Sequence, residues 1–138
     1  EHNMNFYDWW EENKGWYIEN GISKEEFEKF SLKNGFNKGD IMVLVGKKPE
    51  QIEIGDVIVF KSNRKDPIIH RVVKKMRNDS GVYFQTKGDN NRDSIKNGDL
   101  DETNLDEDVI IGKAVLRVPL LGYIKIWFVE ALKFIGLA

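Results

Sequence analysis

The sequence contains no cysteine and only two histidines, and these shortages limit its chemistry. Without cysteine the chain has no disulfides, no thiol nucleophile and no thiolate metal ligand, although the redox compartment stays open. Because His2 and His70 are the only imidazoles, a histidine-rich metal site is also excluded. The sequence therefore predicts neither a metal site nor a cofactor.

An excess of charge of one sign and long apolar runs are also missing. The 138 residues carry a formal net charge of -2. No basic stripe is interleaved with aromatic residues, so we expect no nucleic-acid partner. No uninterrupted apolar run reaches the roughly 20 residues of a membrane-spanning helix, and no signal-peptide pattern opens the chain. The length suits one domain with its own core.

The most informative stretch is a predicted hairpin that carries His70. Residues 66–73 read Asp-Pro-Ile-Ile-His-Arg-Val-Val and predict a strand that begins after a proline. Residues 86–91 read Thr-Lys-Gly-Asp-Asn-Asn and predict the end of the returning strand, with the carboxylates of Asp89 and Asp93 beyond it. An imidazole on one strand and carboxylates at the end of the next can form a general base and its orienting acid.

The middle of the chain predicts a mainly β fold. Asn78–Gly81 is a hairpin-turn signal, and residues 90–108 predict a polar, strongly charged loop. Because short turns join several β-rich segments, we expect a compact, antiparallel, partly closed β-domain. Apolar runs predict the strands, at residues 41–45, 57–60, 68–75, 82–86 and 109–118.

Residues 5–30 predict helices ahead of this β-domain. The stretch is rich in Trp, Tyr and Phe, and we expect a break at Gly15. Ser23 followed by Glu26 is a capping-box pattern for a short second helix. Two interpretations of the aromatic residues stay open. They belong to a helical hairpin that packs on the β-domain, or some of them lie at a membrane interface, which suits Trp and Tyr.

Residues 122–138 predict a C-terminal amphipathic helix, with Ile, Trp, Phe and Leu mostly on one side and Lys and Glu on the other. Such a helix suits a membrane interface, and the alternatives are a cap on the domain's own core or a truncated membrane helix. The chain thus divides into a helical N-terminal insertion or linker (1–37), a catalytic-type β-domain (38–121) and this C-terminal helix (122–138).

Five segments together resemble a known family. In order and spacing they are similar to signal peptidase I of the archaeal and endoplasmic-reticulum type, and the resemblance runs from residue 31 to residue 123. The bacterial branch of that family places a lysine where this chain has His70. The five segments are Lys-Gly-Asp-Ile-Met-Val (38–43), Gly-Asp-Val-Ile-Val-Phe (55–60), Pro-Ile-Ile-His-Arg-Val-Val (67–73), Gln-Thr-Lys-Gly-Asp-Asn-Asn (85–91) and residues 111–123.

The resemblance implies a membrane-anchored serine endopeptidase that removes signal peptides from secreted preproteins on the extracytoplasmic side. Its substrates would be preproteins that are cut after small residues. Its partners would be membrane lipid and complex subunits of unknown identity. His70 would be the general base, with Asp89 or Asp93 fixing its tautomer. The spacing from Asp89 to Asp93 is shorter than the family pattern. The alternatives are a structural role for His70 and turn-stabilising roles for both aspartates.

The nucleophilic serine has two candidate locations. Ser31 stands eight residues before Gly39, as the family motif Ser-Met-x-Pro requires, but Leu32 and Asn34 replace its Met and Pro. In the alternative, the serine precedes Glu1. The chain has neither a start methionine nor the membrane helix that family members carry ahead of this domain. We therefore expect it to be a piece of a longer protein.

Two other functions stay open. The mismatch after Ser31 suggests a catalytically inactive, signal-peptidase-like subunit that binds or scaffolds partners in a membrane complex. A self-cleaving repressor-type peptidase has a related fold, but that class uses a Ser-Lys pair and a DNA-binding domain. His70 and the lack of such a domain argue against it.

Overall fold

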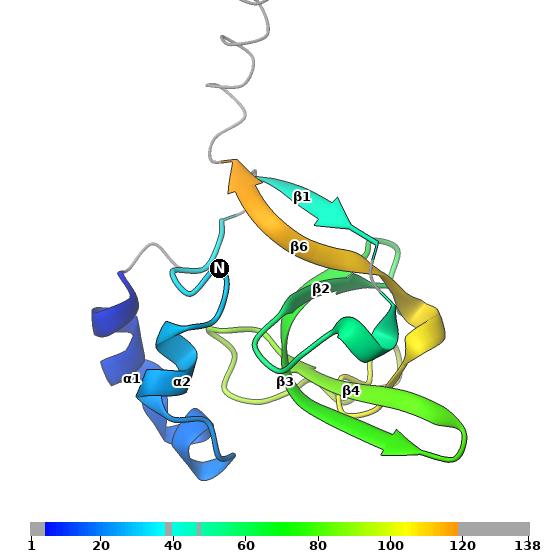
Figure 1. Ribbon diagram of the computed structural model, residues 1–138, viewed down its shortest axis with the longest axis horizontal. Helices are drawn as coiled ribbons and strands as arrows, with labels where there is room; N and C mark the ends of the chain where they lie inside the picture. Colours follow the sequence, from blue (N-terminus) through cyan, green and yellow to red (C-terminus); the bar gives the residue numbers. More distant parts are fainter. Residues whose placement is uncertain (1–4, 38–39, 47, 119–138) are drawn as a thin grey trace, which may run out of the picture.

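A six-stranded antiparallel sheet forms most of the protein in the computed structural model, which describes residues 5–37, 40–46 and 48–118 (Figure 1). Its strand order is β1-β6-β2-β3-β4-β5, so the sheet is not closed and β1 and β5 are its edges. The predicted mainly β, antiparallel fold is confirmed, whereas the helix predicted for residues 122–138 lies outside the described residues. The strands are β1 (Ile41–Val45), β2 (Val57–Phe60), β3 (Ile68–Asn78), β4 (Gly81–Lys87), β5 (Leu105–Asp106) and β6 (Ile110–Val118).

Two helices lie next to each other on one side of the sheet (Figure 1). They are α1 (Phe6–Glu19) and α2 (Lys24–Glu28). The predicted start of the second helix at Ser23 is confirmed, because the Ser23 hydroxyl accepts a hydrogen bond from the Glu26 amide at 3.1 Å. The first helix does not break at Gly15, so that prediction is wrong. A helical glycine costs only about 1 kcal/mol relative to alanine, which the surrounding turns of α1 can offset.

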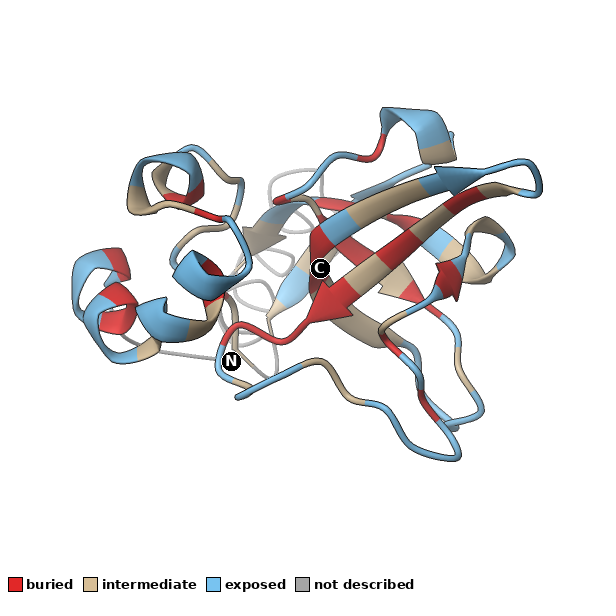
Figure 2. Ribbon diagram, turned by 90° about the horizontal axis from the view of Figure 1, so that it is seen from below, coloured by how far each residue is buried: buried red, intermediate tan, exposed pale blue. Residues whose placement is uncertain are grey.

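Two hydrophobic clusters lie on the two faces of β3, because successive side chains of a strand point in opposite directions. Figure 2 shows buried residues alternating with less buried ones along the strands. Val72 belongs to the cluster on one face of the sheet, called the inner cluster below, and Val73 belongs to the cluster on the opposite face, next to the helices. The inner cluster consists of Ile52, Ile58, Phe60, Val72, Val82, Phe84, Leu100 and Leu105.

The second cluster joins the helices to the sheet. Trp9, Tyr17 and Phe27 are fully buried in it, and the Trp9 and Phe27 ring centroids lie 5.0 Å apart. This is the helical hairpin packed on the β-domain, the first of the two interpretations above. No described helix is long and apolar enough to span a membrane. The cluster consists of Phe6, Trp9, Trp10, Tyr17, Ile22, Phe27 and Val73.

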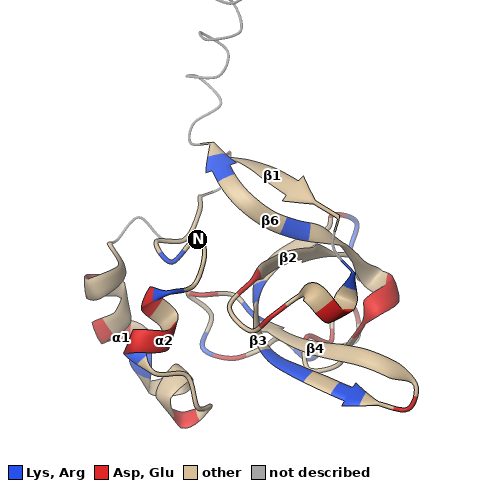
Figure 3. Cartoon of the chain, viewed as in Figure 1, with Lys and Arg blue, Asp and Glu red and all other residues tan. Residues whose placement is uncertain are grey.

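Two short 3-10 turns complete the described elements, η1 (Pro49–Gln51) and η2 (Glu107–Val109). The β3–β4 hairpin has the predicted turn at Asn78–Gly81, where Gly81 adopts φ 137°. Basic residues follow the part of β3 that runs toward this turn (Figure 3). One of them, Lys75, donates to the Glu50 carbonyl at 2.9 Å.

Candidate active site

A few charged side chains are buried where β3 and β4 meet the helices and the 88–102 segment. Arg71 and Lys87 are 1% exposed, Asp89 is 7% exposed and Glu102 is fully buried. A buried charge needs a partner to offset its desolvation. These four side chains, together with His70, therefore define the polar centre of the molecule.

The strand alternation separates these residues into two groups. His70 pairs in register with Ile58, and Val72 pairs with Thr86, so His70 and Thr86 lie on the face of the inner cluster. Arg71 pairs with Lys87 on the opposite face, toward the helices. Neighbours in sequence thus take part in different interactions.

The imidazole of His70 contacts the buried carboxylate of Glu102, through Nδ1 and Oε1. Oε1 also accepts a hydrogen bond from the Thr86 hydroxyl at 2.8 Å, and Oε2 accepts one from the Ile95 amide at 2.8 Å. The backbone of Glu102 is held as well, by the Thr86 amide at 3.0 Å and the Ile95 carbonyl at 2.8 Å. Carboxylate oxygens accept hydrogen bonds, so the Thr86 hydroxyl and the Ile95 amide are suitable donors to Glu102.

A cavity of about 330 Å³ lies beside His70. A methyl group on Gly88 would come within 2.9 Å of His70 Nε2 and 2.6 Å of Asn91 Nδ2, so the glycine permits a close approach to the ring. The imidazole stays 20% exposed. The cavity is lined by Gly35, Phe36, Val57, Arg64, Pro67, Ile68, Ile69, His70, Arg71, Gly88, Asp89, Asn91 and Ile95.

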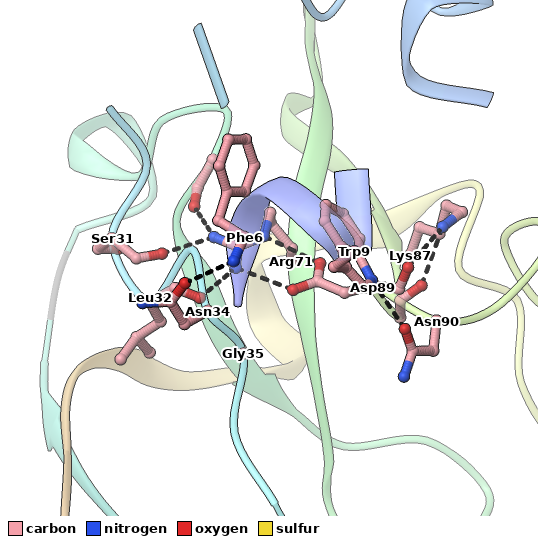
Figure 4. A network of polar contacts seen from close by, with 12 residues as sticks. Phe6, Trp9, Ser31, Leu32, Asn34, Gly35, Arg71, Lys87, Asp89 and Asn90 are labelled. Carbon is pink, nitrogen blue, oxygen red and sulfur yellow. Dashed lines mark hydrogen bonds and ion pairs between the residues drawn. The ribbon is translucent and has the colours of Figure 1, made fainter. Parts of the chain in front are cut away.

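Arg71 is the centre of the second group (Figure 4). Its Nε and Nη2 donate to the two carboxylate oxygens of Asp89 at 3.0 and 2.9 Å. Its remaining donors reach the carbonyls of Ser31 at 2.7 Å, Leu32 at 2.7 Å and Gly55 at 2.8 Å. A bidentate pair with every other donor used satisfies a buried guanidinium. Arg71 thereby ties the loop after the helices to the sheet.

Lys87 supports the turn that carries Gly88 and Asp89. Its Nζ donates to the Tyr17 hydroxyl at 3.1 Å and to the Gly88 carbonyl at 3.0 Å. Burial lowers the pKa of Lys87 to about 8, although the nearby Asp89 carboxylate opposes this shift. Burial also raises the pKa of the Tyr17 hydroxyl, and the Asp89 charge adds to that effect.

The structure brings two of the four predicted site residues to the cavity wall, His70 and Asp89. Asp89 pairs with Arg71, and the carboxylate on the His70 Nδ1 atom is that of Glu102. Asp93 is exposed and accepts hydrogen bonds from the Trp16 indole at 3.0 Å and the Ser94 amide at 2.7 Å. Ser31 is exposed at the start of the loop whose Gly35 lines the cavity.

Glu102 is the site residue that sequence reasoning missed. It lies in the stretch predicted as a polar loop, between the exposed Asp101 and the half-buried Thr103. The one weak sequence signal is that Glu102 stands two residues after the apolar Leu100, the spacing of residues on one face of a strand. Apolar and polar residues that alternate with a period of two indicate an extended segment with one face turned toward the core.

The arrangement suits proton transfer. A carboxylate on the Nδ1 atom of an imidazole favours the tautomer whose Nε2 atom is free to accept a proton. In the part of the chain that the structure describes, no group of three or more His, Asp or Glu side chains is arranged to hold a metal ion.

Comparison with known proteins finds relatives that are named as catalytic subunits of the signal peptidase complex. The chain is 34% identical over 102 residues to the signal peptidase complex catalytic subunit SEC11C of Homo sapiens, which covers 70% of this chain and 52% of that protein. It is 35% identical over 103 residues to SEC11 of Fusarium vanettenii, covering 72% of this chain and 60% of the relative. SEC11 of Pyricularia oryzae is 32% identical over the same length. No family model matches.

The chain spans only about half to three-fifths of the length of these curated relatives. Within that span, the chain is similar to proteins named as catalytic subunits of the signal peptidase complex. They are eukaryotic proteins, so they support the family as a whole rather than its archaeal branch.

Proposed function

We propose that this chain is the catalytic β-domain of a signal peptidase, a serine endopeptidase that removes signal peptides from secreted preproteins. The main support is the His70 imidazole, which has a carboxylate on Nδ1 and stands at the wall of a cavity. The similarity to SEC11 catalytic subunits over 70% of the chain adds to it.

His70 acts as the general base and then as the general acid. A serine hydroxyl is a weak nucleophile unless a neighbouring base takes its proton. His70 Nε2 removes this proton as the serine oxygen attacks the scissile carbonyl carbon, and then returns it to the leaving amine as the peptide bond breaks. In the second half, His70 takes a proton from a water molecule. The resulting hydroxide attacks the ester carbonyl carbon of the acyl-enzyme. His70 then returns the proton to the serine oxygen as the ester bond breaks and the cleaved signal peptide leaves.

The substrate binds as an extended strand beside the start of β3. Strand β4 pairs with β3 from Arg71 onward, whereas the cavity lies beside residues 68–70, which pair only with β2 among the described strands. A peptide placed there continues the sheet where β4 ends, and main-chain hydrogen bonds supply much of its affinity. Ile68 and Phe36 give the cavity an apolar part of its wall, which suits small apolar side chains before the cleaved bond.

The nucleophile is either Ser31 or a serine ahead of Glu1. The loop after α2 brings Gly35 and Phe36 to the cavity wall, and Arg71 holds the Ser31 carbonyl nearby at 2.7 Å. A Ser31→Ala substitution separates the two cases. Loss of cleavage identifies Ser31, and unchanged cleavage assigns the nucleophile to a serine ahead of Glu1.

Asp89 and Asp93 are part of the proposed site as well. Asp89 lines the cavity and holds Arg71, the neighbour of His70 on β3. Asp93 lies on the polar segment that follows, and we assign it a weaker electrostatic effect on the site. We also propose the archaeal-type Ser-His chemistry, membrane anchoring, an extracytoplasmic domain, and contact with lipid and further complex subunits.

The test is cleavage of a preprotein by the full-length protein in membrane vesicles, with the product mapped by mass spectrometry. The proposal predicts a single cut that follows a small residue at the end of the signal peptide. Intact preprotein after prolonged incubation, with binding retained, would instead assign the chain to the inactive class.

That inactive class is the second candidate, a signal-peptidase-like binding or scaffold subunit. Ser31 is exposed and is not itself one of the residues that line the cavity, which favours this class. It predicts the same preprotein binding without cleavage, and no effect of substituting His70.

A further inference from the structure

We infer that Glu102 is the positioning residue that orients His70 and fixes its tautomer, the role expected from Asp89 or Asp93. The catalytic meaning of this assignment rests on the proposed function. The geometry behind it does not, because it depends only on the contacts of one buried carboxylate.

Glu102 is built into the fold as an acceptor. Oε1 contacts His70 Nδ1 and accepts a hydrogen bond from the Thr86 hydroxyl, and Oε2 accepts one from the Ile95 amide. The segment on either side is fixed by backbone hydrogen bonds to Thr86 and Ile95. A fully buried carboxylate that is held at both oxygens has no freedom to turn away from the ring.

Asp89 is directed elsewhere by the alternation of the strands. Both of its oxygens accept hydrogen bonds from Arg71, which points to the helix side of β3. His70 points to the inner side, together with Thr86 of β4. Glu102 lies on that inner side and reaches both residues.

The consequence concerns which ring nitrogen carries the proton. With Nδ1–H donated to Glu102, Nε2 keeps its lone pair toward Gly88 and the cavity. When Nε2 takes the proton of the serine hydroxyl, the ring becomes an imidazolium, and the adjacent carboxylate stabilises that charge while staying ionised itself.

The first measurement is the tautomer of His70 in the wild-type chain, by ¹⁵N NMR of the ring nitrogens at a pH where the imidazole is neutral. The chain has only two histidines, and a His2→Gln variant assigns the signals. We expect a protonated Nδ1 and a bare Nε2. The opposite tautomer in the wild-type protein would overturn the inference without any variant.

The second measurement uses Glu102→Gln. The Ile95 amide needs an acceptor, so it retains the new amide oxygen and turns the NH₂ group toward His70. That group donates to Nδ1 and forces the proton onto Nε2. We expect the tautomer to invert and kcat to fall between about 10²- and 10⁴-fold with little change in KM, as for tautomer loss in serine triads. Glu102→Asp should keep the wild-type tautomer and recover part of kcat.

Asp101→Asn is the matched control, because it removes an exposed carboxylate one residue away. It should leave both the tautomer and kcat unchanged. A Glu102→Gln variant with the wild-type tautomer and kcat would overturn the role of Glu102 while leaving the peptidase proposal intact. A chain that has the expected tautomer but cleaves no preprotein would overturn the peptidase proposal and leave the role of Glu102 in orienting His70 intact.

Discussion

At the scale of single residues, the site depends on two neighbours that point to opposite faces of β3. His70 reaches the buried Glu102 and borders the cavity, whereas Arg71 binds Asp89 and the loop after the helices. In the proposed function, His70 supplies the reactive imidazole, and its neighbour Arg71 attaches the loop after the helices to the sheet. A one-residue slip of β3 would exchange the two faces and destroy both interactions.

Gly88 is predicted to leave the space that the His70 imidazole needs in its observed position. In Gly88→Ala the new methyl group lies 2.9 Å from His70 Nε2 and displaces the ring. Because small misplacements of a catalytic group are costly, we expect the cleavage rate to fall about 10- to 100-fold, measured as initial rates on a preprotein. Gly98→Ala is the control, since its methyl group meets nothing within 4 Å. Equal rates in the two variants would contradict this role.

Lys87 makes the stability depend on pH. Burial lowers its pKa to about 8 in the folded protein, whereas the unfolded chain keeps this proton up to about 10.4. Between these values the unfolded state binds more protons, so the free energy of unfolding rises with pH. Below pH 8, Lys87 is protonated in both the folded and the unfolded state, so its contribution to the free energy of unfolding does not change with pH.

We expect the free energy of unfolding of the wild type to rise by on the order of 1–2 kcal/mol relative to Lys87→Met between pH 7 and pH 9.5. Urea unfolding at several pH values measures this difference. The range stops there because the raised pKa of Tyr17 lowers stability once the unfolded tyrosine ionises, above about pH 10. Parallel pH curves for the two proteins would exclude a depressed pKa for Lys87.

The site was only partly predictable from sequence at this scale. His70 could be placed because it is the one histidine in a clear strand pattern. Its partner was sought among the nearest carboxylates, Asp89 and Asp93. Glu102 is 32 residues away from His70 in a charged segment, and local pattern does not reveal which acid of such a segment turns inward.

At the scale of elements, two local signals gave correct predictions. The turn at Asn78–Gly81 and the cap of α2 depend on residues close in sequence, and both are present. The break expected at Gly15 is absent, because one glycine weakens a helix without ending it. The two-residue strand β5 was missed, since Leu105–Asp106 is too short to show any period.

Two glycines are predicted to respond in opposite ways to alanine. Gly15 lies within α1, where a methyl group would meet nothing within 4 Å, so Gly15→Ala should stabilise the protein by about 0.5–1 kcal/mol. Gly55 has φ +99°, and its methyl group would lie 2.2 Å from the Phe30 ring. Gly55→Ala should therefore destabilise by about 1–3 kcal/mol.

Chemical denaturation of both variants at one pH measures these changes in the free energy of unfolding. A destabilised Gly15→Ala protein would show that α1 does bend at that point. A neutral Gly55→Ala substitution would contradict the close packing of Phe30 on the start of β2.

At the scale of the whole molecule, the helices and the sheet are joined through a buried guanidinium. Arg71 lies 4.9 Å from the centre of the Phe27 ring in the helical cluster, and it binds carbonyls from the loop after α2. The same group holds Asp89 at the cavity wall. The helices thus help to shape the cavity without lining it themselves.

Sequence patterns predicted both parts of the molecule but not this junction. The aromatic stretch indicated a helical hairpin, and the apolar runs indicated the sheet. Their contact passes through Arg71, whose partners at Ser31 and Leu32 are about 40 residues away and are backbone carbonyls. Any residue type supplies a carbonyl, so no sequence pattern marks the contact.

Arg71→Met is predicted to destabilise the protein by about 3–5 kcal/mol, because it leaves Asp89 buried without its bidentate partner. The double variant Arg71→Met/Asp89→Asn should lose less than the sum of the single losses. A double-mutant cycle of urea unfolding measures this coupling. Strictly additive losses would mean that the pair contributes nothing as a unit.

The central claim is that His70 is the general base of a signal peptidase. The most direct measurement compares preprotein cleavage by the full-length wild type, His70→Ala and His2→Ala, with folding checked by circular dichroism. We predict that His70→Ala folds but cleaves about 10³-fold more slowly or worse, while His2→Ala cleaves normally. Wild-type cleavage by folded His70→Ala would contradict the claim.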